Sequence, residues 1–133
     1  MTGNTIQRCW NRCTLAPRPL TWETEGRPCG IVYRAAGPLG RLCGLVGRES
    51  VPGDGLLLDP CSSIHTFGMR FPIDVVFLDA GRRILGLREQ VAPWRCAWAP
   101  RSTRMVLELA AGRARALNLQ CDERTSFTPW PPG

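Results

Sequence analysis

The stretch Pro72-Ile-Asp-Val-Val-Phe-Leu78 decides the fold. Five of the six residues after the proline are apolar, and most of them are β-branched or aromatic, which is typical of a β-strand. Side chains alternate across a strand, so Asp74 shares its face with Val76 and Leu78, while the opposite face is wholly apolar. The stretch therefore predicts a central strand that is covered on both sides.

Turns and further strand-like runs lie on either side of this stretch. Asp79-Ala-Gly-Arg82 predicts a hairpin turn into a strand over residues 83–88. Residues 103–109 alternate, with Leu107 and Leu109 on one face and Glu108 on the other. Shorter strand-like runs occur at residues 31–33, 56–58 and 62–67.

Helical signals are few by comparison. Leucines spaced three and four apart in residues 38–48 predict one or two helical turns, and residues 112–119 predict another. Short strands at close intervals, separated by glycine and proline turns, are typical of a sandwich or barrel. We therefore predict a mainly β (α+β) protein, namely a single compact β-sandwich or barrel-like domain with one or two short helices.

Length and composition suit one folded domain. The chain has 133 residues, of which 44% are hydrophobic and 21% charged. We expect an irregular N-terminal leader over residues 1–29, a β-sandwich-like domain over residues 30–124 and a proline-rich tail over residues 125–133. No run approaches the ~20 apolar residues that a helix needs to cross a bilayer.

The basic residues are all arginine, and the formal net charge is +6. The absence of lysine excludes Schiff-base and P-loop lysine chemistry. Residues 1–40 carry five arginines and two acidic residues, and residues 41–133 carry twelve and nine, so each part has a net charge of +3. This even spread, without a basic run, argues against nucleic acid as the partner.

Seven cysteines are present, without a closely spaced pair of the zinc-binding type, and His65 is the only histidine. We expect most of these thiols to be reduced and expect neither a metal site nor a cofactor. Because the N-terminal residues lack the apolar core of an export signal, we expect a cytoplasmic protein.

Several motifs in order resemble a known family. They are Arg41-Leu-Cys-Gly-Leu-Val-Gly-Arg48, Gly55-Leu-Leu-Leu58, His65-Thr-Phe-Gly-Met-Arg-Phe-Pro-Ile-Asp74 with its apolar continuation, and Val106-Leu-Glu-Leu109 with Gly112. Over about residues 30–124 the chain resembles the bacterial and archaeal domain-of-unknown-function family 192. Many members carry Trp-Met-Lys-Asn where this chain has His65-Thr-Phe-Gly68, so it resembles a His-Thr-Phe-Gly-Met-Arg branch.

The resemblance implies a compact β-sandwich-like domain and no established reaction. It further implies an association with pilus-assembly or secretion machinery. The departure at residues 65–68 means that a ligand of the Trp-Met-Lys-Asn members does not carry over to this chain.

Asp74 and His65 are the first candidate site residues. A buried carboxylate needs a hydrogen-bonding or charged partner, because an unpaired buried charge is costly. One interpretation is structural, with backbone amides or an arginine satisfying Asp74 so that it pins a loop. The other is functional: if residues 62–67 and 73–78 are neighbours, His65 and Asp74 could meet as an acid/base pair in a pocket. His65 could alternatively be an aromatic plug with one hydrogen bond.

Cys61 extends this hypothesis in two directions. A Cys61–His65 nucleophile pair or a metal site of Cys61, His65 and Asp74 is conceivable. Residues four apart in a strand lie ~13 Å apart, so direct contact between Cys61 and His65 requires a bend. Neither version is supported by a catalytic motif.

Arg70, Trp94 and Trp98 complete the candidate ligand-binding residues. Arg70 is expected to pair with Asp74, to bind an anion or to be solvated. Prolines bracket the two tryptophans in the loop over residues 92–100, and exposed tryptophan on a rigid loop would mark a recognition surface.

We therefore expect an accessory or binding domain rather than an enzyme, with a polar pocket at Asp74, His65 and Arg70 and a rim at Trp94 and Trp98. The expected ligand is a small polar or anionic molecule or a protein segment. Two alternatives stay open: a hydrolase-like enzyme that uses His65 and Asp74 as acid and base, and a structural interaction domain without a pocket.

Overall fold

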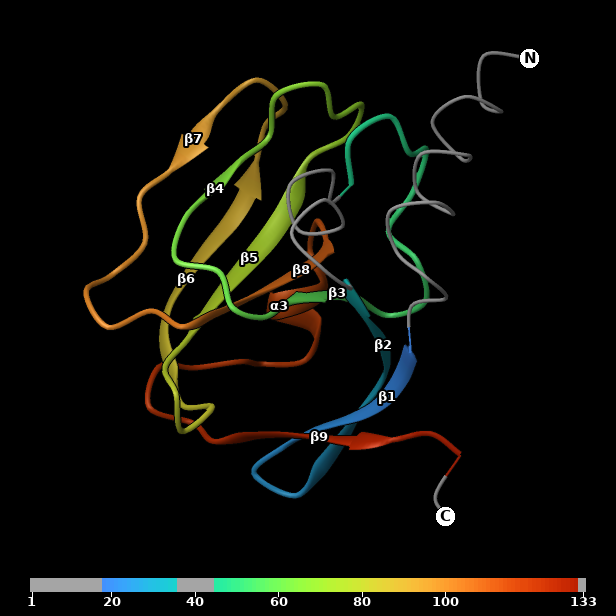
Figure 1. Cartoon of the computed structure of the whole chain (residues 1–133), viewed down its shortest axis with the longest axis vertical. Coiled ribbons are helices and arrows are strands. Elements are labelled where there is room, and N and C mark those ends of the chain that lie inside the picture. Colours follow the sequence, from blue (N-terminus) through green and yellow to red (C-terminus); the bar gives the residue numbers. More distant parts are fainter. Residues whose placement is uncertain (1–17, 36–44, 132–133) are drawn as a thin grey trace.

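A computed structural model describes residues 18–35 and 45–131 of the chain. These residues form nine strands and one short helix (Figure 1). The elements are β1 (Arg18–Thr24), β2 (Arg27–Ala35), β3 (Leu56–Leu58), β4 (Ile64–His65), β5 (Ile73–Leu78), β6 (Ile84–Val91), β7 (Cys96–Ala97), β8 (Met105–Ala110), α3 (Arg113–Ala116) and β9 (Thr125–Pro129).

Seven strands form one open sheet in the order β6-β5-β8-β3-β2-β1-β9, and β4 pairs with β7 in a separate two-stranded ribbon. Among the strands of residues 18–35 and 45–131, only the pairing of β2 with β3 is parallel. β5 lies between β6 and β8, and all six of its residues are buried, which confirms the predicted central strand. The predicted fold class is likewise confirmed: the protein is mainly β, and its sheet stays open instead of closing into a barrel.

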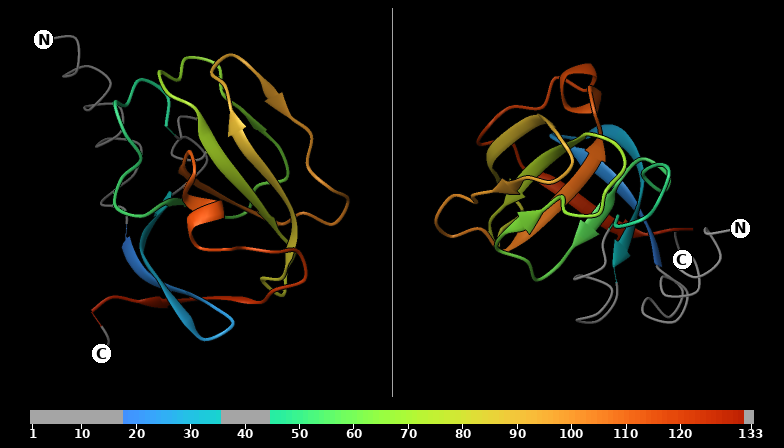
Figure 2. Two further views of the ribbon diagram at one scale, coloured as in Figure 1. Left: turned by 180° about the vertical axis from the view of Figure 1, so that it is seen from behind. Right: turned by 90° about the horizontal axis from the view of Figure 1, so that it is seen from above.

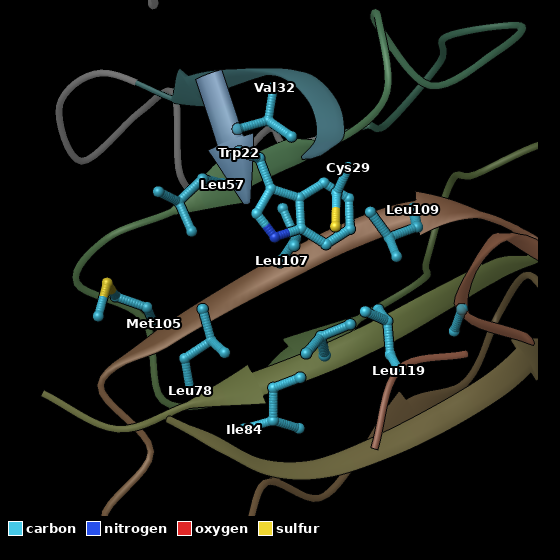
Figure 3. Packing of buried hydrophobic residues seen from close by; sticks show 12 residues of the cluster. Trp22, Cys29, Val32, Leu57, Leu78, Ile84, Met105, Leu107, Leu109 and Leu119 are labelled. Atoms are coloured by element: carbon cyan, nitrogen blue, oxygen red, sulfur yellow. The ribbon is translucent and has the colours of Figure 1, made fainter. Parts of the chain in front are cut away.

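The sheet curls so that its two ends enclose one of two cores (Figures 1 and 2). Trp22 of β1 is fully buried in this core and packs with residues of β2, β3, β5, β6 and β8 (Figure 3). Alternation gives each face of the sheet its own cluster, because Val76 of β5 belongs to this core and Val75 belongs to the other.

The second core lies on the other face of the sheet, beneath the β4–β7 ribbon. Ile64 of β4 and Ala97 of β7 point into it, together with Leu45 and Met69. The ribbon and β9 lie at opposite ends of the molecule (Figures 1 and 2). Among the described residues, no helix has the length and hydrophobicity needed to cross a bilayer.

Both expected ends of the domain need correction. Residues 18–29, expected in an irregular leader, form β1 and the start of β2, and residues 125–129, expected in a tail, form β9. β1 pairs with β2 on one side and with β9 on the other, and these backbone hydrogen bonds form despite the prolines in the three segments. Residues 1–17 and 132–133 lie outside the described residues, as do residues 38–44 of the expected helical segment.

The predicted hairpin turn and C-terminal helical turn are confirmed. Asp79 Oδ1 accepts hydrogen bonds from the backbone amides of Gly81 and Arg83, which fixes the turn between β5 and β6. The helical signal in residues 112–119 corresponds to α3.

Candidate functional site

Asp74 is completely buried, and two backbone amides satisfy its carboxylate. Oδ1 accepts a hydrogen bond from Gln90 N of β6 at 2.8 Å, and Oδ2 accepts one from Ala114 N of α3 at 2.9 Å. Charge-assisted bonds of this kind are stronger than neutral ones. Asp74 therefore joins the edge strand to the helix across β5, as the structural interpretation of this residue predicts.

The predicted His65–Asp74 pair does not form. Asp74 points to the face of the sheet that carries α3, whereas β4 lies over the other face, where Ile64 enters the core. The His65 side chain is exposed and stacks on Phe67, with 5.2 Å between the ring centroids. The predicted pair requires residues 62–67 and 73–78 to be neighbours, whereas β4 pairs with β7 instead of β5.

Arg70 does not pair with Asp74 either. Arg70 is exposed in the connection between β4 and β5, and the Asp74 oxygens bind amides on the far side of the sheet. The proposed metal site of Cys61, His65 and Asp74 is not assembled. Within the two described ranges, no group of three or more His, Cys, Asp or Glu side chains could hold a metal ion.

The β4–β7 ribbon instead gathers exposed aromatic side chains on its outer face. Burial alternates along residues 64–67, with Ile64 and Thr66 buried and His65 and Phe67 exposed. Across the ribbon, the Phe67 ring lies 6.1 Å from that of Trp94. We call the aromatic face the exposed rings of the two ribbon segments: His65, Phe67 and Trp94, which are linked by ring contacts, and Trp98, which directly follows β7.

Thr66 fixes the backbone beneath the aromatic face. Its buried hydroxyl donates to Ala92 O at 2.6 Å and accepts from Arg95 N at 2.8 Å. The Thr66 amide donates to Arg95 O, and the Trp94 amide donates to Thr66 O. Thr66 therefore holds the segment that contains His65 in register with the segment that contains Trp94.

Replacing Thr66 with valine should loosen this frame, because valine keeps the shape but leaves Ala92 O and Arg95 N without their hydroxyl partner. We expect a loss of about 1–3 kcal/mol in unfolding free energy and faster amide hydrogen exchange at Trp94 and Arg95. Thr103→Val is the matched control, since the exposed Thr103 hydroxyl makes one bond to Pro100 O. Equal exchange rates in wild type and Thr66→Val would contradict the role assigned to Thr66.

Glu108 is a buried carboxyl group that the sequence placed on a polar face. The alternation along β8 is as predicted, but both faces of this strand are covered. Glu108 is 4% exposed between Leu56 of β3 and Val75 of β5, and its Oε2 makes no hydrogen bond. Burial raises the pKa of Glu108 from 4.5 to about 8 because it disfavours the charged form.

Three features of this region escaped the sequence argument, each for a local reason. Phe67 is exposed and its ring links those of His65 and Trp94, although an apolar side chain of this size favours burial. Thr66 belongs to no recognisable motif. Its burial is indicated in the sequence only by the alternation of side chains along residues 64–67. Glu108, like Asp74, is the one charged residue of an otherwise apolar strand. That pattern predicts burial for Glu108 as it does for Asp74.

Comparison with known proteins adds the family and the fold. The family model DUF192, described as "Uncharacterized ACR", matches residues 23–127. A protein of unknown function from Novosphingobium aromaticivorans is 20% identical, with a TM-score of 0.70 over 81% of this chain and 83% of its own. A candidate transcription regulator from Sinorhizobium meliloti is 25% identical, with a TM-score of 0.71 over 84% of this chain and 94% of its own. No curated protein matches the chain.

Proposed function

The chain belongs to the DUF192 family of uncharacterised proteins, and we propose that it is a binding module whose aromatic face captures an acidic segment of a partner protein. The observation that carries this proposal is the pair of exposed tryptophans on the ribbon. Trp94 is 63% exposed on a backbone that Thr66 holds in place, and Trp98, just after β7, is 85% exposed. Rigid, exposed aromatic side chains are the usual anchors of protein recognition.

Trp94 also has a backbone conformation that stability alone does not favour. Its φ angle is +63°, in the left-handed region that side chains of this size rarely adopt. Such a residue costs roughly 1–3 kcal/mol, and the strain persists because the surrounding hydrogen bonds impose it. A strained and solvent-exposed tryptophan is consistent with selection for contact with a partner.

The charges of the two segments that carry the aromatic face favour an acidic partner. Residues 61–72 and 92–101 contain Arg70, Arg95 and Arg101 and no acidic residue. All three arginines are exposed. An acidic segment with apolar or aromatic side chains is complementary to this combination of rings and positive charge.

The form of the ribbon favours a polypeptide over a nucleic acid. β4 and β7 pair only with each other among the described strands, so each leaves an edge to which an extended segment could add. The Phe67 ring already contacts His65 and Trp94, which leaves less flat ring surface for stacked bases. A role in pilus or secretion machinery would also involve a protein partner. That role stays a prediction.

The test uses the full chain and a fluorescein-labelled random copolymer of glutamate and tyrosine. We expect saturable binding by fluorescence anisotropy, weakened at least about tenfold by the double variant Trp94→Ala/Trp98→Ala. Trp130→Ala should bind normally, because Trp130 is a 48% exposed tryptophan next to β9, at the other end of the molecule. A lysine–tyrosine copolymer should bind much more weakly than the acidic one.

Two results would overturn the proposal. Copolymer binding that the double variant leaves unchanged would remove the aromatic face from recognition. Tighter binding of a single-stranded oligothymidylate through the same tryptophans would assign the face to nucleic acid, in keeping with the name of the Sinorhizobium meliloti relative.

A further inference from the structure

A second candidate site lies on the other side of the sheet, between β6 and α3. A hollow of about 200 Å³ opens there, with an apolar floor and a polar rim. Ala114 and Leu119 belong to the core that contains Trp22, so the hollow and the aromatic face are on opposite faces of the sheet. Its lining residues are Leu87, Glu89, Ala114, Arg115, Asn118 and Leu119.

The rim of the hollow carries one charge of each sign. Glu89 Oε1 and Arg115 Nε are 3.9 Å apart; the Arg115 side chain is 85% exposed and that of Glu89 is 45% exposed. An exposed ion pair at this distance contributes little to stability, so either group can turn to a ligand at small cost. A guanidinium binds carboxylate well, and a carboxylate accepts hydrogen bonds from an ammonium group.

The two walls of the hollow are held at a fixed separation by Asp74. Its carboxylate binds Gln90 N, next to Glu89 on β6, and Ala114 N, next to Arg115 on α3. The site is therefore formed before a ligand arrives, which reduces the entropic cost of binding. Asp74 acts here as a positioning residue that does not touch the ligand.

We infer that this hollow binds a free aliphatic α-amino acid. The α-carboxylate would pair with Arg115, the α-ammonium with Glu89, and the side chain would lie on Leu87 and Leu119. The volume of about 200 Å³ is below the range of about 300–1,000 Å³ that suits drug-sized ligands, and it fits a small molecule of this class. A ligand with only one charge would bind either Glu89 or Arg115 and leave the other without a partner in the complex.

The test is a titration of the ¹⁵N-labelled full chain with L-leucine, followed by amide chemical shifts. We expect saturable shifts at Gln90, Ala114 and Arg115. Three analogues each remove one feature: 4-methylpentanoate lacks the ammonium group, isoamylamine lacks the carboxylate, and glycine lacks the aliphatic side chain. Each should bind at least about fivefold more weakly than leucine, because each gives up one of the three contacts.

A charge exchange separates recognition from general effects on the fold. Arg115→Glu and Glu89→Arg should each abolish the leucine shifts, and the double variant Glu89→Arg/Arg115→Glu should restore them. Arg82→Glu, in the exposed turn between β5 and β6, is the control for net charge and should leave binding unchanged. Equal shifts from leucine and isoamylamine, or a double variant that stays inactive while its spectrum is native-like, would overturn the inference.

Discussion

Replacing Glu108 with leucine should stabilise the protein by several kcal/mol above pH 8 and by much less at pH 4. The carboxyl group is buried between Leu56 and Val75, and Oε2 makes no hydrogen bond. Ionisation in this environment is opposed by the loss of hydration. Leucine of similar volume removes the ionisable group and keeps the packing.

The direction of the pH dependence follows from the raised pKa. Below pH 4.5, Glu108 is protonated in both the folded and the unfolded state and imposes no ionisation penalty. Between pH 4.5 and about 8 the unfolded chain releases the proton while the folded protein keeps it, so stability falls as pH rises. Above about pH 8 both states are ionised, and the full penalty, of order 5 kcal/mol, remains.

Urea unfolding of wild type and Glu108→Leu between pH 4 and pH 9 measures this effect as a difference curve. Other titrating groups are shared by the two proteins and cancel in that difference. Glu108→Gln should flatten the curve as well, with a smaller gain because its amide is buried in the same place. Glu49→Gln is the control for an exposed glutamate, and we expect less than about 0.5 kcal/mol at any pH. Parallel curves for wild type and Glu108→Leu would contradict the raised pKa.

The parts of the fold that the sequence predicts are those with local signals. The apolar run over residues 73–78 and the turn at residues 79–82 each define their own structure. β1 was missed because Arg18 and Pro19 look like the end of a leader, although Trp22 and Thr24 share a buried face two residues apart. Pro19 is tolerated because it lies near the start of β1, where no residue of β9 pairs with it, and Pro129 is tolerated at the end of the edge strand β9.

The candidate site was less predictable because its contacts are long-range. β4 and β7 are joined through Thr66 and Arg95, which are 29 residues apart, and a two-residue strand has no periodicity to detect. The exposure that a recognition role requires of Trp94 and Trp98 is observed. The partners of Asp74 lie 16 and 40 residues away, so burial could be inferred from the strand but its bonding could not.

Replacing Asp74 with alanine should destabilise the protein by about 3–5 kcal/mol, a large share of the stability of a domain of this size. The change leaves the amides of Gln90 and Ala114 buried or half-buried without an acceptor and removes the link between β6 and α3. Asp74→Asn keeps the side-chain volume and one oxygen that can accept a hydrogen bond, so we expect it to lower the unfolding free energy by about half as much as alanine does. Urea unfolding gives the free energies, and hydrogen exchange at Ala114 reports the release of α3.

Asp79→Asn is the matched control, because Asp79 also accepts two backbone hydrogen bonds but does so in an exposed turn. Water can replace that acceptor, so a loss of at most about 1 kcal/mol is expected. Asp74→Asn should also weaken leucine binding at α3 while the aromatic face keeps its affinity for the acidic copolymer, because the sheet separates the two. If Asp74→Asn were as stable as wild type and altered the aromatic face instead, Asp74 would belong to a functional site with His65 after all.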